Sequence, residues 1–241
     1  MIKRSVLMGD PTYFSIKHGN NPHTRNLWGV KKKVDIDLAI TQWHCLAKLL
    51  TRYGVDVYVI KPDPNCPGLV YPANAGFLTH LDDHIPIQDK TFYLSYLMPG
   101  RKAEEPHYRN MLKELGFKTE QFHKSMEGEA DFFRWGNIYC FTYGEIQEQR
   151  IAFHFGFPPY RRVYGFRSDQ RLEFQLKRIV EPQEVLALKL VDEYHYHGDT
   201  VLSAFGPNRE YLLVWMDGLE RESQKNLILH NQSNIILLND M

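Results

Sequence analysis

Two histidines and a carboxylate, His195, His197 and Asp199, alternate within residues 194–200. We interpret this segment as the end of a β-strand, in which residues two apart share a face, so the three side chains would point into one pocket. An imidazole beside a carboxylate can transfer protons as a general acid or base, and the same residue types bind metal ions. A chance alternation on the surface is the third interpretation.

Three other segments carry side chains that could contact a polar substrate. Asn74 is flanked by small residues, which let a ligand approach the backbone, and its amide both donates and accepts hydrogen bonds. The carboxylates of Glu127, Glu129 and Asp131 lie close together before an aromatic run and could bind a cation. Arg101 could pair with a carboxylate through two parallel hydrogen bonds. Each segment also has an ordinary explanation, namely a turn, a solvated acidic loop or a surface arginine.

The composition narrows the class of partner and the compartment. Lysine plus arginine and aspartate plus glutamate each total 29, so the charge does not indicate nucleic acid or an anionic membrane, and we expect a small substrate. The cysteines, Cys45, Cys66 and Cys140, form neither a disulfide framework nor a CxxC pair, which is typical of the cytoplasm. No apolar run approaches the ~20 residues of a membrane span, and the N-terminal apolar segment is too short for a signal peptide.

Strand and helix patterns alternate along the chain and predict a single α/β domain over residues 1–241. The expected strands are 6–8, 55–60, 91–97, 117–122, 137–142, 184–191, 211–216 and 234–238, and the expected helices are 34–49, 105–115, 168–180 and 219–229. The pattern recurs roughly every 50 to 65 residues, which indicates repeated units. We expect Cys45 on the buried face of the first helix and Cys140 in a buried strand.

Short motifs follow one another over nearly the whole chain. They are Val6-Leu7-Met8 with Pro11-Thr12-Tyr13-Phe14, Asn21-Pro22, Ala73-Asn74-Ala75-Gly76, Glu127-Gly128 to Asp131, Tyr164-Gly165-Phe166-Arg167 and Tyr196-His197-Gly198-Asp199-Thr200. Their order and spacing resemble the guanidino-group-modifying enzymes, in the branch that contains arginine dihydrolases, amidinotransferases and dimethylargininase-like proteins.

The resemblance implies a fold and a reaction. The fold is a pentein, an α/β propeller of ββαβ-type units around a pseudo-fivefold axis, with the active site in the central channel. The reaction is attack of a cysteine thiolate on the guanidinium carbon of arginine or a derivative. Water then gives ornithine or citrulline plus ammonia, or an amine accepts the amidino group. No cofactor or metal is implied, and the expected partner is a guanidino substrate, with a homo-oligomer as a further possibility.

The resemblance also implies roles for individual residues in catalysis. His197 is the general acid and base, and Asp199 orients its ring or holds the guanidinium. Glu127 binds the guanidinium nitrogens, with Asp131 as the second such carboxylate and Glu129 as an alternative.

Three further residues match substrate-contacting positions of the dihydrolase branch. They are Asn21, Asn74 and Arg101. Arg101 would pair with the α-carboxylate of the substrate, and the amide of Asn74 would fix its orientation. Asn74 stands where arginine deiminases carry an aspartate, and asparagine there is typical of the ornithine-forming branch.

The chain departs from the family pattern in three places. The nucleophilic cysteine of the family lies in a C-terminal segment, so we expect it beyond residue 241, with four units present and the fifth missing. Ala130 replaces the second glycine of the acidic motif. Residues 145–163 form an insertion, which we interpret as a lid, a subunit contact or a packed loop.

Three function classes follow from these observations. The first is a cysteine-dependent guanidine hydrolase or amidinotransferase. The second is a homologue that binds guanidino compounds without catalysis, because the nucleophile is absent from the expected place. The third is a metallohydrolase that uses His195, His197 and Asp199, with further ligands from residues 80–84, although Thr200 stands where such sites usually carry another histidine.

Overall fold

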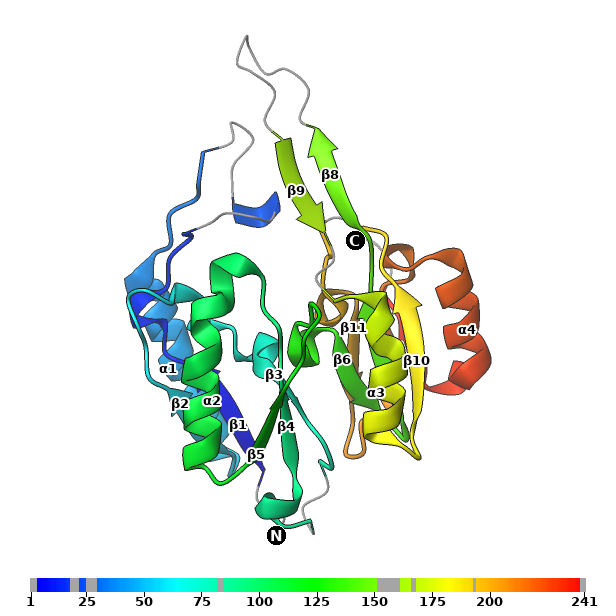
Figure 1. The fold of residues 1–241 in the computed structure, drawn as a ribbon, viewed down its shortest axis with the longest axis horizontal. Helices are drawn as coiled ribbons and strands as arrows, with labels where there is room; N and C mark the ends of the chain where they lie inside the picture. The colour runs from blue at the N-terminus through cyan, green and yellow to red at the C-terminus, as the bar shows by residue number, and fades with distance from the viewer. Residues whose placement is uncertain are drawn as a thin grey trace. The chain divides into compact units, whose positions relative to one another are not determined.

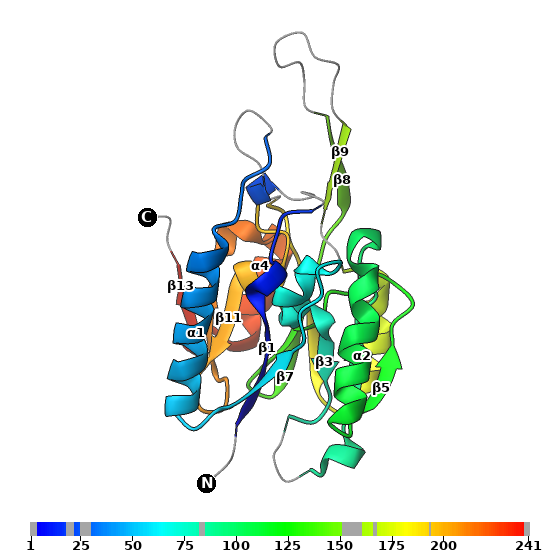
Figure 2. The ribbon, with the colours of Figure 1, turned by 90° about the vertical axis from the view of Figure 1, so that its left-hand side faces the viewer.

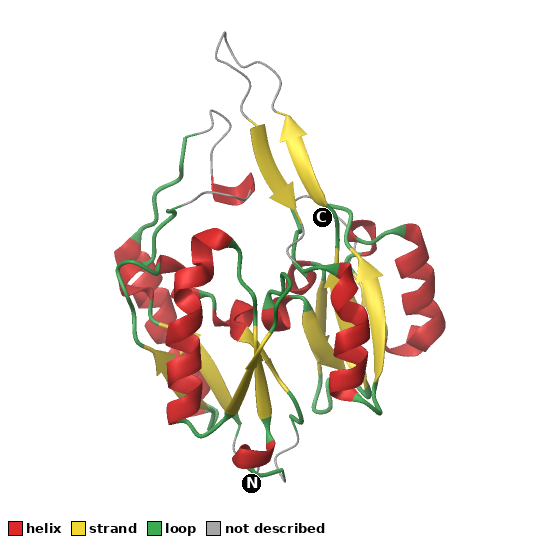
Figure 3. Ribbon diagram, viewed as in Figure 1, coloured by secondary structure: helices red, strands yellow, loops and turns green. Residues whose placement is uncertain are grey.

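The computed structural model describes residues 4–17, 22–24, 30–81, 85–150, 161–165, 168–192 and 194–238. The chain divides into two compact units. Unit 1 comprises Met1–Gly19 and Thr24–His123, and unit 2 comprises Asn20–His23 and Lys124–Met241. Helices and strands alternate in both units, which confirms the predicted α/β class (Figures 1 and 3). The prediction of a single domain over the whole chain stays a prediction.

The first sheet of unit 1 joins β1 (Ser5–Gly9) to β2 (Asp56–Ile60) in parallel. The connection is α1 (Ile36–Arg52), which packs on β2 (Figure 2). The Asp35 side chain caps the helix by accepting a hydrogen bond from the backbone N–H of Leu38 at 3.0 Å. This strand, helix and parallel strand form one crossover unit.

The second sheet of unit 1 has three strands. They are β3 (Gly76–Leu78), β4 (Thr91–Leu94) and β5 (Lys118–Gln121), with α2 (Glu105–Glu114) between β4 and β5 in the chain. β3 is antiparallel to β4, and β5 is parallel to β4. Buried Leu94, Tyr108 and Leu112 hold α2 against this sheet in a core that also includes Leu69. The loops before β3 and α2 contain short 3-10 helices, which carry the polar residues discussed below.

Unit 2 contains two further three-stranded sheets. The first has β6 (Phe132–Trp135), β7 (Ile138–Tyr143) and β10 (Glu184–Lys189), with α3 (Glu173–Val180) before β10. The second has β11 (Leu202–Phe205), β12 (Tyr211–Val214) and β13 (Ile235–Leu237), with α4 (Arg221–Asn231) before β13. In both, the first strand pairs antiparallel with the second and the third pairs parallel with it. This is the same order as in the second sheet of unit 1.

The predicted strands and helices are present, with ends that differ by a few residues. The first strand of each three-stranded sheet, namely β3, β6 and β11, was not predicted. Each closely follows a 3-10 helix, so no clear break in the pattern marks where the strand begins. The predicted helix 168–180 begins instead with the 3-10 helix η8 (Gln170–Leu172) before α3.

The predicted insertion at 145–163 is described only in part. β8 (Ile146–Arg150) and β9 (Arg161–Gly165) form an antiparallel pair, and residues 151–160 lie outside the described residues. The proposed roles of this segment as a lid, subunit contact or packed loop stay predictions.

The two cysteines assigned to the core behave differently. Cys140 is fully buried in β7, as predicted, and burial raises the pKa of its thiol to about 12. The prediction for Cys45 is wrong, because this residue of α1 is exposed. Leu46 and Leu49 on the same helix are each 50% exposed. Helical periodicity identifies the apolar side of a helix but not what covers it.

No helix among the described residues has the length and apolar character that crossing a membrane requires.

One apolar core connects the two three-stranded sheets of unit 2, and α4 closes it with Leu227. Leu227 is 0% exposed, whereas Leu229 on the same helix is 83% exposed. We expect Leu227→Ala to lower the free energy of unfolding by about 2–5 kcal/mol, because it leaves a cavity. The same change at Leu229 is expected to cost less than about 0.5 kcal/mol. Urea unfolding of both variants measures the difference, and equal costs would contradict this packing of α4.

Candidate functional site

Asp131 and His197 lie far apart in the chain and meet in unit 2. Asp131 ends the 3-10 helix η7 (Gly128–Ala130), and His197 precedes the 3-10 helix η9 (Gly198–Thr200). These two short helices pack against each other, and η9 also packs on β7. The predicted acidic motif and histidine motif therefore form one cluster.

The Asp131 carboxylate is surrounded by hydrogen-bond donors. Its Oδ1 accepts from the backbone N–H of Gly198 at 3.1 Å and from the hydroxyl of Thr142 at 3.2 Å, and it lies 3.2 Å from Nδ1 of His197. Its Oδ2 accepts from the hydroxyl of Ser168 at 2.6 Å. Only 1% of Asp131 is exposed, so these contacts must replace the water that a buried carboxylate loses.

These contacts clarify what Asp131 can do. A carboxylate has about four acceptor positions, and four protein groups approach the oxygens of Asp131. The geometry favours a role in holding His197 over the predicted contact with a guanidinium. It also gives Asp131 the ring-orienting role that the sequence offered to Asp199.

The contact with Asp131 sets the chemistry of the His197 ring. A proton on Nδ1 can be donated to the carboxylate, which leaves Nε2 as the basic nitrogen. The ring of Tyr196 lies 4.7 Å from the His197 ring, centroid to centroid, and limits its rotation. A buried imidazole held in this way can act as a general acid or base.

Gly198 allows η9 to approach β7 closely. A Cβ atom at this position would lie 2.3 Å from Oγ1 of Thr142 and 3.0 Å from the carbonyl oxygen of Ala130. Any side chain would therefore displace Thr142 or force η9 away from β7 and η7. This explains why a glycine separates the histidine from Asp199.

Asp199 lies in η9, next to this cluster. Asp199 is partly open to solvent, but much protein surrounds its carboxyl group. This burial is the main cause that raises the pKa of the carboxyl to about 6. The negative charge of Asp131 raises the pKa further, whereas the charge of His197 lowers it. Asp199 is thus a carboxylate whose ionised form would gain from a cationic neighbour.

The predicted strand end at residues 194–200 is wrong. Gly198–Thr200 form a 3-10 helix, so alternate residues do not share a face. Nδ1 of His195 lies 3.2 Å from Oδ1 of Asp192, and the His195 ring lies 4.5 Å from Trp215. Among the described residues, His195, His197 and Asp199 do not bring ligand atoms together as a metal site requires. The metallohydrolase interpretation therefore has no support from these three residues. Residues 82–84, from which further ligands were predicted, lie outside the described residues.

Ser168 connects the two acidic residues of the motif. It accepts a hydrogen bond from the backbone N–H of Glu127 at 3.2 Å while its own hydroxyl donates to Asp131. The Glu127 side chain is buried next to this cluster. Glu129 is only partly buried, and burial raises the pKa of its carboxyl while the positive charge of Arg209 lowers it.

Two predicted substrate residues bind each other in unit 1. Arg101, in the 3-10 helix η6 (Pro99–Glu104), donates from Nη1 to Oδ1 of Asn74 at 2.7 Å. Its Nη2 donates to the carbonyl oxygen of Gly68 at 3.0 Å and to Glu104 at 2.7 Å, and its Nε donates to Glu104 at 3.1 Å. Glu104 is 2% exposed, so this is a buried ion pair that holds the Asn74 amide.

Some site residues were not predicted, and some predicted ones cannot be placed. The sequence analysis missed Thr142, Ser168 and Glu104. Only Glu104 could have been found from the sequence, because it lies three residues after Arg101, a spacing at which charged side chains on a helix pair. Asn21, predicted to contact substrate, lies outside the described residues.

The hydrogen bonds of Asp131 predict a measurable contribution to stability. Asp131→Asn keeps the shape but removes the charge and places an amide N–H₂ among donors, so we expect a loss of about 1–3 kcal/mol in the free energy of unfolding. The control is Asp217→Asn, because Asp217 is exposed, with an expected change within about 0.5 kcal/mol. Urea unfolding that shows equal changes would overturn the described cluster.

The raised pKa of Asp199 predicts how stability changes with pH. The folded protein holds this proton up to about pH 6, whereas the unfolded chain releases it near the ordinary value of 3.8. Between those pH values the folded state binds more protons, so Asp199 lowers the free energy of unfolding as pH rises and has a constant effect above about pH 6. Urea unfolding of Asp199→Asn should show no such decrease in the free energy of unfolding. If the free energies of wild type and variant differ by the same amount at every pH between 3.8 and about 6, the raised pKa is contradicted.

Comparison with known proteins finds relatives by sequence and by fold. No family model matches the chain. The chain is 28% identical over 201 residues to N(G),N(G)-dimethylarginine dimethylaminohydrolase of Mycobacterium tuberculosis, covering 83% of the chain and 55% of that protein. It is 26% identical over 221 residues to the bifunctional arginine dihydrolase/ornithine cyclodeaminase AgrE of Nostoc sp., covering 91% of the chain and 27% of that protein. The chain thus spans about half the length of the first relative and about a quarter of the second.

Solved structures show the same fold. The N-terminal domain of ArgZ with a covalently bound reaction intermediate superposes with a TM-score of 0.77 at 22% identity, over 98% of this chain and 75% of that one. AgrE in a binary complex with L-arginine gives a TM-score of 0.78 at 23% identity, over 98% of this chain and 31% of that one. By sequence, the homologues of the chain are thus a dimethylarginine dimethylaminohydrolase and bifunctional arginine dihydrolases, and its fold is that of the ArgZ and AgrE structures.

Proposed function

We propose that this chain provides the acid–base and substrate-binding parts of an enzyme that hydrolyses the guanidino group of arginine or a derivative. The observation that carries the proposal is the His197 imidazole, which is buried and held through Nδ1 by the carboxylate of Asp131. The names of the relatives support the substrate class, because they are a dimethylarginine dimethylaminohydrolase and arginine dihydrolases. One related structure contains L-arginine.

The proposed reaction begins with a cysteine thiolate, which forms a bond to the guanidinium carbon. As the carbon–nitrogen bond breaks, protonated His197 gives its Nε2 proton to the leaving nitrogen, so that a neutral amine or ammonia departs. Neutral His197 then takes a proton from water, whose oxygen attacks the covalent amidino intermediate. Breakage of the carbon–sulfur bond regenerates the thiolate. Attack by an amine in place of water would transfer the amidino group.

The nucleophile is proposed to be a cysteine C-terminal to residue 241, as the family resemblance implies. The chain's own buried cysteines are poor candidates, because burial raises the thiol pKa of Cys140 to about 12 and also raises that of Cys66. These buried thiols also favour a second candidate function, in which the chain binds guanidino compounds without cleaving them.

Asp199 is the proposed partner of the guanidinium group. The cation would favour the ionised form of this carboxylate and reverse the effect that burial has on its pKa. Glu127 is proposed as the second carboxylate, because it is buried beside the same cluster. Asn21, Asn74 and Arg101 are proposed to contact the rest of the substrate, as the resemblance implies.

The finer fold assignment is also a proposal. Three sheets repeat the order of two antiparallel strands, a helix and a parallel strand, and β1, α1 and β2 match the last three members of that order. This repetition supports a pentein propeller in which a further unit, with the nucleophile, completes the ring.

A comparison of two neighbouring histidines tests the acid–base assignment. In the chain extended through its natural C-terminal segment, we expect His197→Ala to lower kcat for release of ornithine or citrulline from arginine by about 100- to 10,000-fold. His195→Ala is the control, because His195 pairs with Asp192 instead, and its kcat should stay within about threefold of wild type. Amino-acid analysis and an ammonia assay measure the products, with dimethylarginine as a second substrate.

Two outcomes would count against the proposal. Equal losses in the two variants would remove His197 from its assigned role. If the extended chain neither cleaves a guanidino compound nor transfers its amidino group, the enzymatic proposal fails. Calorimetry with arginine then tests the second candidate function. Heat of binding supports a protein that binds guanidino compounds without cleaving them, and no heat counts against it.

A further inference from the structure

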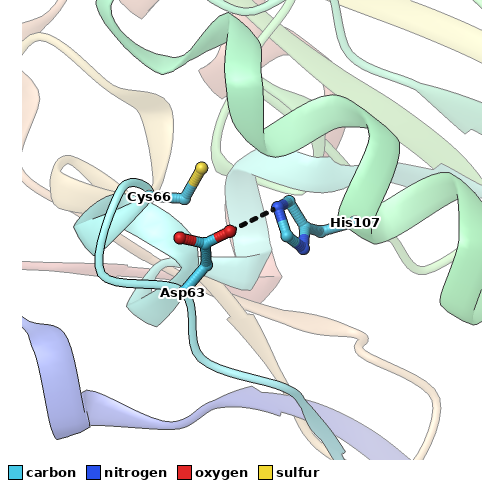
Figure 4. A group of neighbouring side chains, drawn as sticks. All are labelled: Asp63, Cys66 and His107. Atoms are coloured by element: carbon cyan, nitrogen blue, oxygen red, sulfur yellow. Dashed lines mark ion pairs between the residues drawn. The ribbon is translucent and has the colours of Figure 1, made fainter.

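Unit 1 contains a cluster of three chemically different side chains away from the residues discussed above. Asp63 and Cys66 lie in the loop that follows β2, and His107 lies in the first turn of α2. Figure 4 shows the Asp63 carboxylate facing the His107 ring, with the Cys66 side chain beside them. Carboxylate, thiol and imidazole together are the ligand types that proteins use for zinc and related transition metals.

The distances are close to those of a metal site. One ligand atom from each residue lies within 4.8 Å of the others, and Nε2 of His107 lies 3.3 Å from Oδ2 of Asp63. Ligand atoms on one tetrahedral zinc ion are about 3.3–3.6 Å apart, from zinc–ligand bonds of about 2.0–2.3 Å. The imidazole and carboxylate already have this spacing. The Cys66 sulfur lies within 4.8 Å of the other two ligand atoms, so binding requires it to move closer to them.

The backbone fixes the two ligands that come from the loop. The backbone N–H of Asn65 donates to Oδ1 of Asp63 at 2.7 Å, and the backbone N–H of Cys66 donates to the carbonyl oxygen of Asp63 at 2.9 Å. This turn directs Oδ2 of Asp63 toward His107. Cys66 is buried and begins the 3-10 helix η3 (Pro67–Val70). The site is therefore built by a folded turn and a helix, not by long surface side chains.

The charges around Cys66 favour a cation. Burial raises the pKa of the Cys66 thiol, and the negative charges of Asp63 and Glu104 raise it further, while Lys17 opposes them. A divalent cation would neutralise part of this negative charge, and zinc binds cysteine as the thiolate.

We propose that Asp63, Cys66 and His107 bind one zinc ion, with the fourth coordination position open to water. The sulfur and nitrogen ligands discriminate against magnesium and calcium, which take oxygen ligands. The ion would join the loop before η3 to α2. Because Gly68 in η3 accepts a hydrogen bond from Arg101, the ion would also stabilise the segment that holds Arg101 and Asn74.

Cobalt(II) is the probe, because it binds in zinc sites and its absorption spectrum shows which types of ligand surround it. We expect the chain to bind one cobalt(II) ion, with an ultraviolet thiolate-to-cobalt band and the visible bands of a tetrahedral ion, and zinc should displace it. Cys66→Ser should abolish the thiolate band, and His107→Ala should weaken binding at least ~10-fold. Cys45→Ser is the matched control, because Cys45 is an exposed free cysteine, and its spectrum should equal that of wild type.

Thermal unfolding gives a second measurement that does not depend on the spectrum. Zinc should raise the melting temperature of wild type and of Cys45→Ser, and it should raise that of His107→Ala by less. Magnesium should raise none of the three. His107 is partly exposed, so this variant can be compared even if Cys66→Ser does not fold. The proposal is overturned if wild type shows no thiolate band, if the band survives in Cys66→Ser, or if Cys45→Ser abolishes it.

Discussion

The buried negative charge of Asp131 is the constraint on which the arrangement of unit 2 depends. A carboxylate withdrawn from water must be surrounded by donors, and here they come from β7, from η9 and from Ser168 before α3. These segments are distant in the chain, so one side chain determines how closely they pack. His197 takes its orientation from the same carboxylate. The absence of a Cβ at Gly198 is what makes the approach sterically feasible.

The polar residues of unit 1 follow a similar rule with different groups. Glu104 is buried and pairs with Arg101, whose guanidinium then fixes the amide of Asn74. In both units the functional groups sit in or beside 3-10 helices that follow or precede strands. Such short helices have few backbone hydrogen bonds of their own, so side-chain contacts from neighbouring segments decide their positions. Tertiary contacts therefore determine the positions of the candidate functional side chains more than local structure does.

The sequence predicted the helices and most strands because their apolar residues recur with a clear period or stand between turn residues. It did not predict β3, β6 and β11, each of which closely follows a 3-10 helix, so no clear break marks where the strand begins. Motif resemblance found His197 and Asp131, but their contact spans 66 positions and depends on packing that no local pattern encodes. The strand assigned to residues 194–200 was wrong because alternating polar residues also occur in a turn. The exposure of Cys45 shows the same limit. Periodicity indicates which side of a helix is apolar, but it does not show whether another segment covers that side.

The division of the fold into small sheets has a consequence for the behaviour of the chain in solution. An unpaired sheet edge exposes backbone donors and acceptors that can recruit a strand from another molecule. In the described three-stranded sheets, every outer strand except β10 has only three or four residues. Edges this short present few backbone groups to a foreign strand. In these three sheets, the shortness of the outer strands thus limits edge-to-edge pairing with another molecule.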